Sequence, residues 1–90
     1  ELNIENRIKI VKSDVFSFLQ SNIRSYDYIF AGPPYPLPTL NSIPDEIFRC
    51  GALAENGIFV LEHNPNHNFK KHLRYLEERN YGTTIFSFFS

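Results

Sequence analysis

The chain has 90 residues, of which 42% are hydrophobic and 21% charged, which predicts one small globular domain and excludes intrinsic disorder. Lysine and arginine number 9 against 10 acidic residues, so any contact with nucleic acid must be local. One cysteine excludes a disulfide framework, and the histidines lack the spacing of a metal site. Without a membrane-length apolar run or a signal-peptide pattern, we expect a soluble cytoplasmic protein.

The first half of the chain predicts a strand, a helix and a second strand. Ile8 to Val11 is short and β-branched, and Ser13-Asp14 follows where a helix N-cap belongs. Apolar residues then recur at helical spacing as far as Ile23. Tyr26 to Ala31 is nearly continuous in apolar character and stops at Gly32-Pro33-Pro34, which predicts a buried central strand.

A proline-rich loop and a short helix are predicted next. Residues 33–44 hold all but one of the chain's 6 prolines, which fix the backbone and remove hydrogen-bond donors. Pro44 suits the first turn of a helix, followed by two acidic residues and by Ile47 and Phe48 as inward-facing side chains.

The second half of the chain predicts mainly strands. Gly57 to Leu61 is a second apolar run, which Glu62-His63 closes, and we expect it to lie parallel and adjacent to the strand at 26–31. Residues 69–79 fit either a helix or a polar edge strand, and we favour a short helix near Phe69 followed by a hairpin through Tyr81-Gly82. Thr83 to Phe89 is a strong terminal strand.

This element order predicts an α/β fold, a truncated Rossmann-like sheet that is mostly parallel with a C-terminal antiparallel strand or hairpin. Only three short helical patterns are available to cover it, so residues 1–90 are interpreted as a single partial domain. In such sheets ligands bind beyond the carboxyl ends of the strands. The candidate functional residues are therefore Asp14, Gly32-Pro33-Pro34-Tyr35 and Glu62-His63.

The segments 13–16, 26–35, 57–63 and 79–83 resemble the RsmD family, the bacterial small-subunit ribosomal RNA guanine-N2 methyltransferases of the class I type. The resemblance corresponds to the C-terminal half of the family's domain, because the family's glycine-rich cofactor loop lies upstream of the matching residues. It implies methyl transfer from S-adenosyl-L-methionine to the exocyclic amine of a guanine. The implied partner is ribosomal RNA or the small ribosomal subunit, with no membrane and no metal.

The resemblance also assigns roles to the residues of the motif. The Pro33 carbonyl would orient the amine and Tyr35 would stack on a base turned out of its helix, and Pro34 stands between them in the motif. Asp14 stands where the family contacts the adenine of the cofactor, although by its own sequence context it is equally a helix N-cap. Glu62-His63 matches a family segment to which we assign no role.

The motif departs from the family at its first position, where Gly32 replaces an aspartate and supplies no side-chain acceptor. Loss of one such preorganised group costs about 10²- to 10³-fold in rate. Because the family's glycine-rich cofactor loop is also missing from these residues, we expect the 90-residue chain by itself to be inactive. The alternative is a non-catalytic module that keeps the fold for contacts with RNA or protein. We also expect an exposed sheet edge to favour self-association.

The remaining candidates have plain structural interpretations. Pro-Pro-Tyr taken alone is a rigid loop exit. Cys50 is expected to be a small packed residue, and the histidines to be solvated or hydrogen-bonded. Four basic residues near the C-terminus are expected to form a solvated surface, with a phosphate-contacting patch as the less favoured reading: Lys70, Lys71, Arg74 and Arg79.

Overall fold

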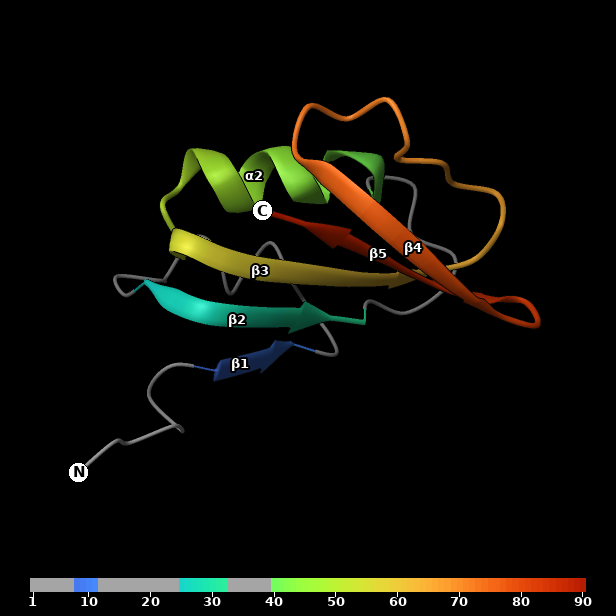
Figure 1. Ribbon diagram of the computed structural model, residues 1–90, viewed down its shortest axis with the longest axis horizontal. Coiled ribbons are helices and arrows are strands. Elements are labelled where there is room, and N and C mark those ends of the chain that lie inside the picture. The colour runs from blue at the N-terminus through green and yellow to red at the C-terminus, as the bar shows by residue number, and fades with distance from the viewer. Residues whose placement is uncertain (1–7, 12–24, 33–39) are drawn as a thin grey trace.

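The computed structural model describes residues 8–11, 25–32 and 40–90, and these form a five-stranded mixed sheet with one α-helix (Figure 1). The spatial order of the strands is β1-β2-β3-β5-β4. In chain order the elements are β1 (Ile8–Val11), β2 (Tyr26–Ala31), the 3-10 helix η2 (Leu40–Ser42), α2 (Ile43–Arg49), β3 (Leu53–His63), β4 (Tyr75–Tyr81) and β5 (Thr84–Phe89).

The first three strands are parallel, as the sequence predicted for its two apolar runs. Phe30 of β2 lies between Ile10 of β1 and Val60 of β3, and the β2–β3 register ends with Ala31 opposite Leu61. Parallel pairing brings the carboxyl ends of these strands to one edge of the sheet. The helix expected after Ser13-Asp14 lies outside the described residues.

The expectation of a mostly parallel sheet is wrong, because β3 pairs antiparallel with β5 and β5 pairs antiparallel with β4. A crossover helix would be needed to add another parallel strand. Instead a tight turn at Gly82, which has a φ of 66°, joins β4 to β5 and makes them antiparallel neighbours. The predicted hairpin is thereby confirmed, and it supplies two of the strands.

The short helix expected near Phe69 is also absent, and residues 65–66 and 70–74 form turns and a bend. The side chains of Asn64 and Asn68 accept hydrogen bonds from the backbone two residues ahead, a local arrangement that competes with helix formation. Phe69 packs inward, with its ring centroid 4.9 Å from that of His63. Leu73, which a helix would bury on the same face, is 95% exposed.

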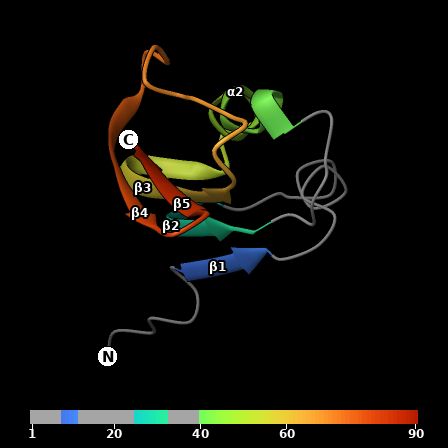
Figure 2. The ribbon, with the colours of Figure 1, turned by 90° about the vertical axis from the view of Figure 1, so that its right-hand side faces the viewer.

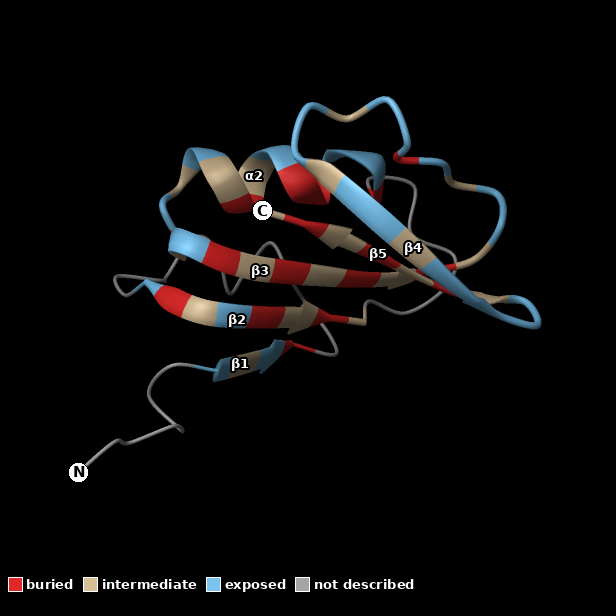
Figure 3. Cartoon of the chain, viewed as in Figure 1, coloured by how far each residue is buried: buried red, intermediate tan, exposed pale blue. Residues whose placement is uncertain are grey.

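The core lies between the sheet and α2 (Figure 2). Burial alternates along the strands, as the red and tan bands of Figure 3 show, so that Phe59, Leu61 and Phe89 face the helix. Ile43 and Ile47 of α2 are fully buried against them, and the helix begins one residue before the predicted Pro44. Among the described elements, none covers the opposite face, and we call this the outer face of the sheet.

Strand β3 begins at Leu53, four residues before the predicted start, and bends near Asn56, whose φ is 67°. Gly57 follows this bend in close contact with neighbouring backbone. A Cβ atom there would lie 2.8 Å from the Ala54 carbonyl oxygen and 2.9 Å from that of Asp27. Only glycine fits at position 57, because the neighbouring backbone leaves no space for a Cβ atom. The bend at Asn56 directly precedes this position.

No helix in the described part of the chain is long and apolar enough to cross a membrane. Cys50 is half-buried against the core, as expected for a small packed residue.

The inward position of Phe69 yields the first prediction. Phe69→Ala should lower the free energy of unfolding by about 3 to 5 kcal/mol, because it leaves a cavity beside His63 and Phe89. Leu73→Ala is the matched control and should change stability by less than about 0.5 kcal/mol, because its side chain is in water. Urea denaturation measures both. Equal losses would mean that this segment is a helix with both side chains packed.

Candidate functional site

The candidate site lies where the three parallel strands end. The backbone N–H of Gly32 donates a hydrogen bond to the Val11 carbonyl at 2.8 Å, so the end of β2 is held against the end of β1. On the other side Ala31 is paired with Leu61, and Glu62 is the next residue of β3. The structure therefore brings the carboxyl ends of β1, β2 and β3, the strands that precede the candidate residues, to one edge of the sheet.

Gly32 and Glu62 are in direct proximity at this edge. A Cβ atom at position 32 would lie 2.8 Å from Glu62 Oε1 and 3.4 Å from the ring of Phe30. The backbone at Gly32 is not in the left-handed region, so its torsion angles do not require glycine, and the close atom is the far end of the flexible Glu62 side chain. The first position of the motif thus faces a carboxylate from the neighbouring strand.

The other predicted site residues lie outside the described residues. Pro33, Pro34 and Tyr35 follow Gly32 directly, and Asp14 comes three residues after Val11 at the end of β1. Their assigned roles stay predictions.

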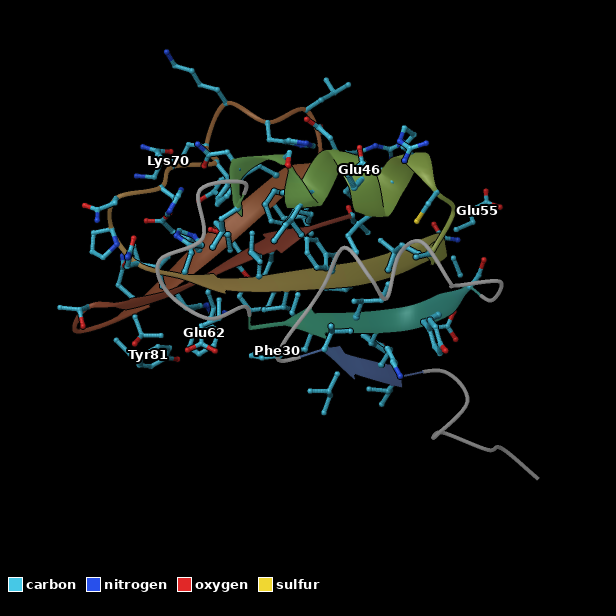
Figure 4. All side chains as sticks on the ribbon, turned by 180° about the vertical axis from the view of Figure 1, so that it is seen from behind. Phe30, Glu46, Glu55, Glu62, Lys70 and Tyr81 are labelled. Carbon is cyan, nitrogen blue, oxygen red and sulfur yellow. The ribbon has the colours of Figure 1, made fainter. Side chains whose placement is uncertain are left out.

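Glu62 lies on the outer face of the sheet, beside a group of aromatic rings. It is paired across the antiparallel ladder with Phe86, whose ring centroid is 5.9 Å from that of Phe30 and 5.8 Å from that of Tyr81. Figure 4 shows Phe30, Glu62 and Tyr81 along the same side of the sheet, with Glu46 of α2 on the opposite side. A shallow hollow of about 600 Å³ lies on the same face, and the residues that line it, which do not include Glu62, are Phe30, Val60, Arg79, Tyr81, Phe86 and Phe88.

His63, the next residue, points to the inner face and is fully buried. Its Nδ1 lies 2.8 Å from the Asn64 carbonyl oxygen, and because a carbonyl only accepts, Nδ1 carries the hydrogen. In the neutral ring Nε2 then accepts from the Ser87 hydroxyl at 2.7 Å. Burial is the main cause that lowers the pKa of His63, and the hydrogen bond to Asn64 opposes it. His63 is a hydrogen-bonded core residue and not a solvated one.

Most of the remaining histidines and basic residues form hydrogen bonds, ion pairs or ring contacts with other side chains of the chain. His67 hydrogen-bonds the Asn41 side chain at 2.8 Å, and His72 donates from Nε2 to Asp45 at 2.7 Å. The expected solvated surface is organised by ion pairs and one ring contact: Lys70 with Glu78, Arg79 with Glu77, and Arg74 over Phe48. Within the described ranges, no cluster of His, Cys, Asp or Glu side chains could hold a metal ion.

Sequence reasoning missed the contact between position 32 and Glu62. The alternation of side chains along a strand places Glu62 and His63 on opposite faces, but the sequence does not say which face adjoins the motif. That required the β2–β3 register, which sets Glu62 beside Gly32. The aromatic hollow was missed for the same reason, because its residues come from four regions of the sheet.

Parallel strands with a helix on one face and candidate residues at the carboxyl edge define an α/β protein consistent with a Rossmann-like fold. The model of a family described as conserved hypothetical protein 95 matches residues 1–90. The chain belongs to this family, the RsmD-type methyltransferase family, so the expected family is confirmed. No curated protein matches the chain.

The burial of His63 yields a prediction about pH. Its pKa in the folded protein is below the ordinary value of 6.5, so the unfolded chain binds more protons between these two values. The neutral, buried His63 ring therefore stabilises the fold fully above about pH 6.5. This contribution to the free energy of unfolding is lost as the pH falls towards the folded pKa. An NMR titration of the assigned ring should give a pKa below 6.5. His63→Gln should remove this part of the pH dependence, and a ring pKa at or above 6.5 would contradict the prediction.

The contact at Gly32 yields a second prediction. Gly32→Asp should place two carboxylates together, so one of them should titrate with a raised pKa because like charges disfavour ionisation. An acid whose pKa is raised by folding makes the fold more stable as the pH falls through that value. Gly32→Asn is the control, with similar bulk and no added charge. Carboxyl ¹³C NMR measures the effect, and a Gly32→Asp protein in which no carboxyl group has a raised pKa would contradict the prediction.

Proposed function

We propose that the protein to which this chain belongs transfers a methyl group from S-adenosyl-L-methionine to the 2-amino group of a guanine in ribosomal RNA. Family membership supports methyl transfer in general. The observation that carries the proposal is the parallel pairing of β1, β2 and β3, because it gathers the motif start and Glu62 at the edge where ligands bind in such sheets.

The chemistry requires hydrogen-bond acceptors at this edge. The lone pair of an exocyclic amine is delocalised into the base, and acceptors on its hydrogens favour the tetrahedral nitrogen that can attack. In the proposal the Pro33 carbonyl is one acceptor and Tyr35 holds the base by stacking. The cofactor, when bound, supplies an electrophilic methyl group on a sulfonium sulfur.

The residues of this edge fit the cofactor in part. Asp14, close after β1 in sequence, is the acidic residue that the proposal assigns to the adenine of the cofactor. The 4 glycines of the chain form no glycine-rich loop that would let a cofactor approach the backbone closely. We therefore propose that tight cofactor binding needs residues beyond these 90.

The second candidate function is a non-catalytic module that binds RNA or protein through the same fold. The observation in its favour is Gly32, which removes the side-chain acceptor of the motif. Binding of S-adenosyl-L-methionine by the full-length protein separates the two functions, because the module has no use for the cofactor.

The proposal predicts methyl transfer by the full-length protein. Incubation with labelled cofactor should methylate ribosomal RNA or assembled small subunits at a guanine. Tyr35→Ala should weaken RNA binding by about 1 to 3 kcal/mol through lost stacking. Tyr28→Ala is the control, because Tyr28 is an exposed aromatic residue within β2, away from the strand end.

The same proposal predicts that the 90-residue chain alone binds the cofactor more weakly than micromolar, which calorimetric titration measures. Micromolar affinity would show that these residues complete the cofactor site. Cofactor binding without any methylation of ribosomal RNA would redirect the search to another substrate, and neither binding nor methylation would favour the non-catalytic module.

A further inference from the structure

We propose that His67 is a positioning residue for methyl transfer, because its hydrogen bond to Asn41 fixes the far end of the motif segment. The motif segment, residues 33–39, connects Gly32 at the end of β2 to Leu40 at the start of η2. Its near end is the one at β2 and its far end the one at η2. The inference rests on the proposed function, in which residues of this segment hold the base, and it names a group outside the motif that keeps them in place.

The near end of the motif segment is tied to the sheet. The backbone N–H of Gly32 donates a hydrogen bond to the Val11 carbonyl oxygen at 2.8 Å. This bond continues the pairing of β2 with β1 by one residue, so the segment starts from a fixed point at the carboxyl edge. A segment attached at one end only keeps the freedom of its backbone torsion angles, and removing that freedom requires a second attachment.

The far end of the segment is held by burial and by one side-chain hydrogen bond. Leu40 is fully buried, and so is Ile43 at the start of α2. Apolar burial is not directional, so by itself it sets the depth of η2 and not the orientation of its exposed side. On that side Oδ1 of Asn41 accepts a hydrogen bond of 2.8 Å from Nδ1 of His67. This bond supplies the direction that burial lacks.

A turn at the end of β3 presents His67 to the far end of the motif segment. Residues 64–67 are Asn-Pro-Asn-His, and asparagine followed by proline is typical of the first two positions of a tight turn. The N–H of His67 donates to the Asn64 carbonyl oxygen at 3.3 Å, and the N–H of Asn66 donates to the Asn64 side chain at 3.0 Å. The turn directly follows His63, whose two ring nitrogens are both hydrogen-bonded. His67 is therefore carried by a short, hydrogen-bonded turn that is anchored at the end of β3.

The motif segment is thus tied to both strands that flank β2. Its near end is bound to β1 through Gly32, and its far end to the turn after β3 through Asn41. Because the three strands end at one edge of the sheet, these two bonds fix both ends of the segment relative to that edge. A misplacement of about 1 Å can cost about 10²-fold in rate, even when its cause lies away from the reacting atoms. His67 touches neither base nor cofactor in the proposal and acts through the position of the motif.

A second histidine of the same stretch forms a comparable bond away from the motif segment. His72 donates from Nε2 to Asp45 at 2.7 Å, and its ring centroid lies 5.4 Å from that of Phe89. Asp45 lies within α2, beyond η2 in the chain, so this bond holds the helix and not the end of the motif segment. The two histidines can therefore separate a positioning effect from a general loss of stability.

The first experiment measures methyl transfer to ribosomal RNA by the full-length protein, in a single turnover at saturating RNA and cofactor. His67→Ala should lower the rate about tenfold and leave the affinity for S-adenosyl-L-methionine unchanged. Asn41→Ala should give the same loss, and the double variant no further loss, because both changes remove one bond. His67→Asn should keep the rate within about twofold, since its amide nitrogen takes the place of Nδ1 as donor.

His72→Ala is the matched control. It should lower the melting temperature, because it removes the bond to Asp45 and the contact with Phe89, and it should leave the rate unchanged. A rate loss as large as that of His67→Ala would overturn the inference, because the effect would then follow stability and not position.

The second experiment follows the motif segment without methyl transfer. Tyr35, Leu37 and Thr39 are its residues with a backbone N–H, because the others are prolines. In the full-length protein His67→Ala should shift their amide NMR signals, and His67→Asn should shift them less. His72→Ala should leave them unchanged. Signals that His67→Ala does not move would overturn the inference.

The two experiments separate the inference from the proposed function. Methyl transfer to ribosomal RNA that is as fast in His67→Ala as in the unchanged protein would overturn the role of His67 and leave the proposed function standing. A protein that methylates no RNA, but whose Tyr35 signal moves in His67→Ala and not in His72→Ala, would overturn the proposed function and support His67 as the residue that positions the motif segment.

Discussion

The pairing of β2 with β3 is the constraint on which the rest of the structure depends. Its register sets Ala31 opposite Leu61, so the next residues, Gly32 and Glu62, become neighbours at the sheet edge. Side chains alternate between the two faces of a strand, so a slip of one residue would exchange every inner and outer position. Glu62 would then enter the core in place of Leu61 or His63. Burying a carboxylate without a partner is costly, which strongly favours the observed register.

The two faces of the sheet show why adjacent residues take opposite roles. His63 is fully buried, yet both of its ring nitrogens are hydrogen-bonded, so its burial is compatible with a neutral ring. Glu62 has no such partners among the described residues, and its place at the edge of the outer face leaves its charge within reach of water and ligands. The inner face carries the buried core, while Glu62 lies at the edge of the outer face.

The side chain at position 32 and the side chain of Glu62 lie next to each other, so each limits the space of the other. A side chain at position 32 would begin 2.8 Å from Glu62 Oε1, so the flexible Glu62 side chain would have to turn aside to admit it. Glycine at the first position of the motif, which in isolation indicates a lost function, therefore has to be judged together with the Glu62 carboxylate beside it. The meaning of the substitution depends on its neighbour in space and not on its neighbours in sequence.

The sequence by itself determined the local elements and the family. The apolar runs at 26–31, 57–61 and 83–89 predict strands, and Pro44 predicts the start of the helix. The motifs indicate the methyltransferase family. Each of these signals lies within a few neighbouring residues. Only the tertiary structure decided the antiparallel insertion of β5 between β3 and β4, the inward turn at Phe69 and the contact of Glu62 with position 32. These features depend on which strands pair and in what register. The hydrophobic pattern within one segment does not reveal the distant segment with which it pairs.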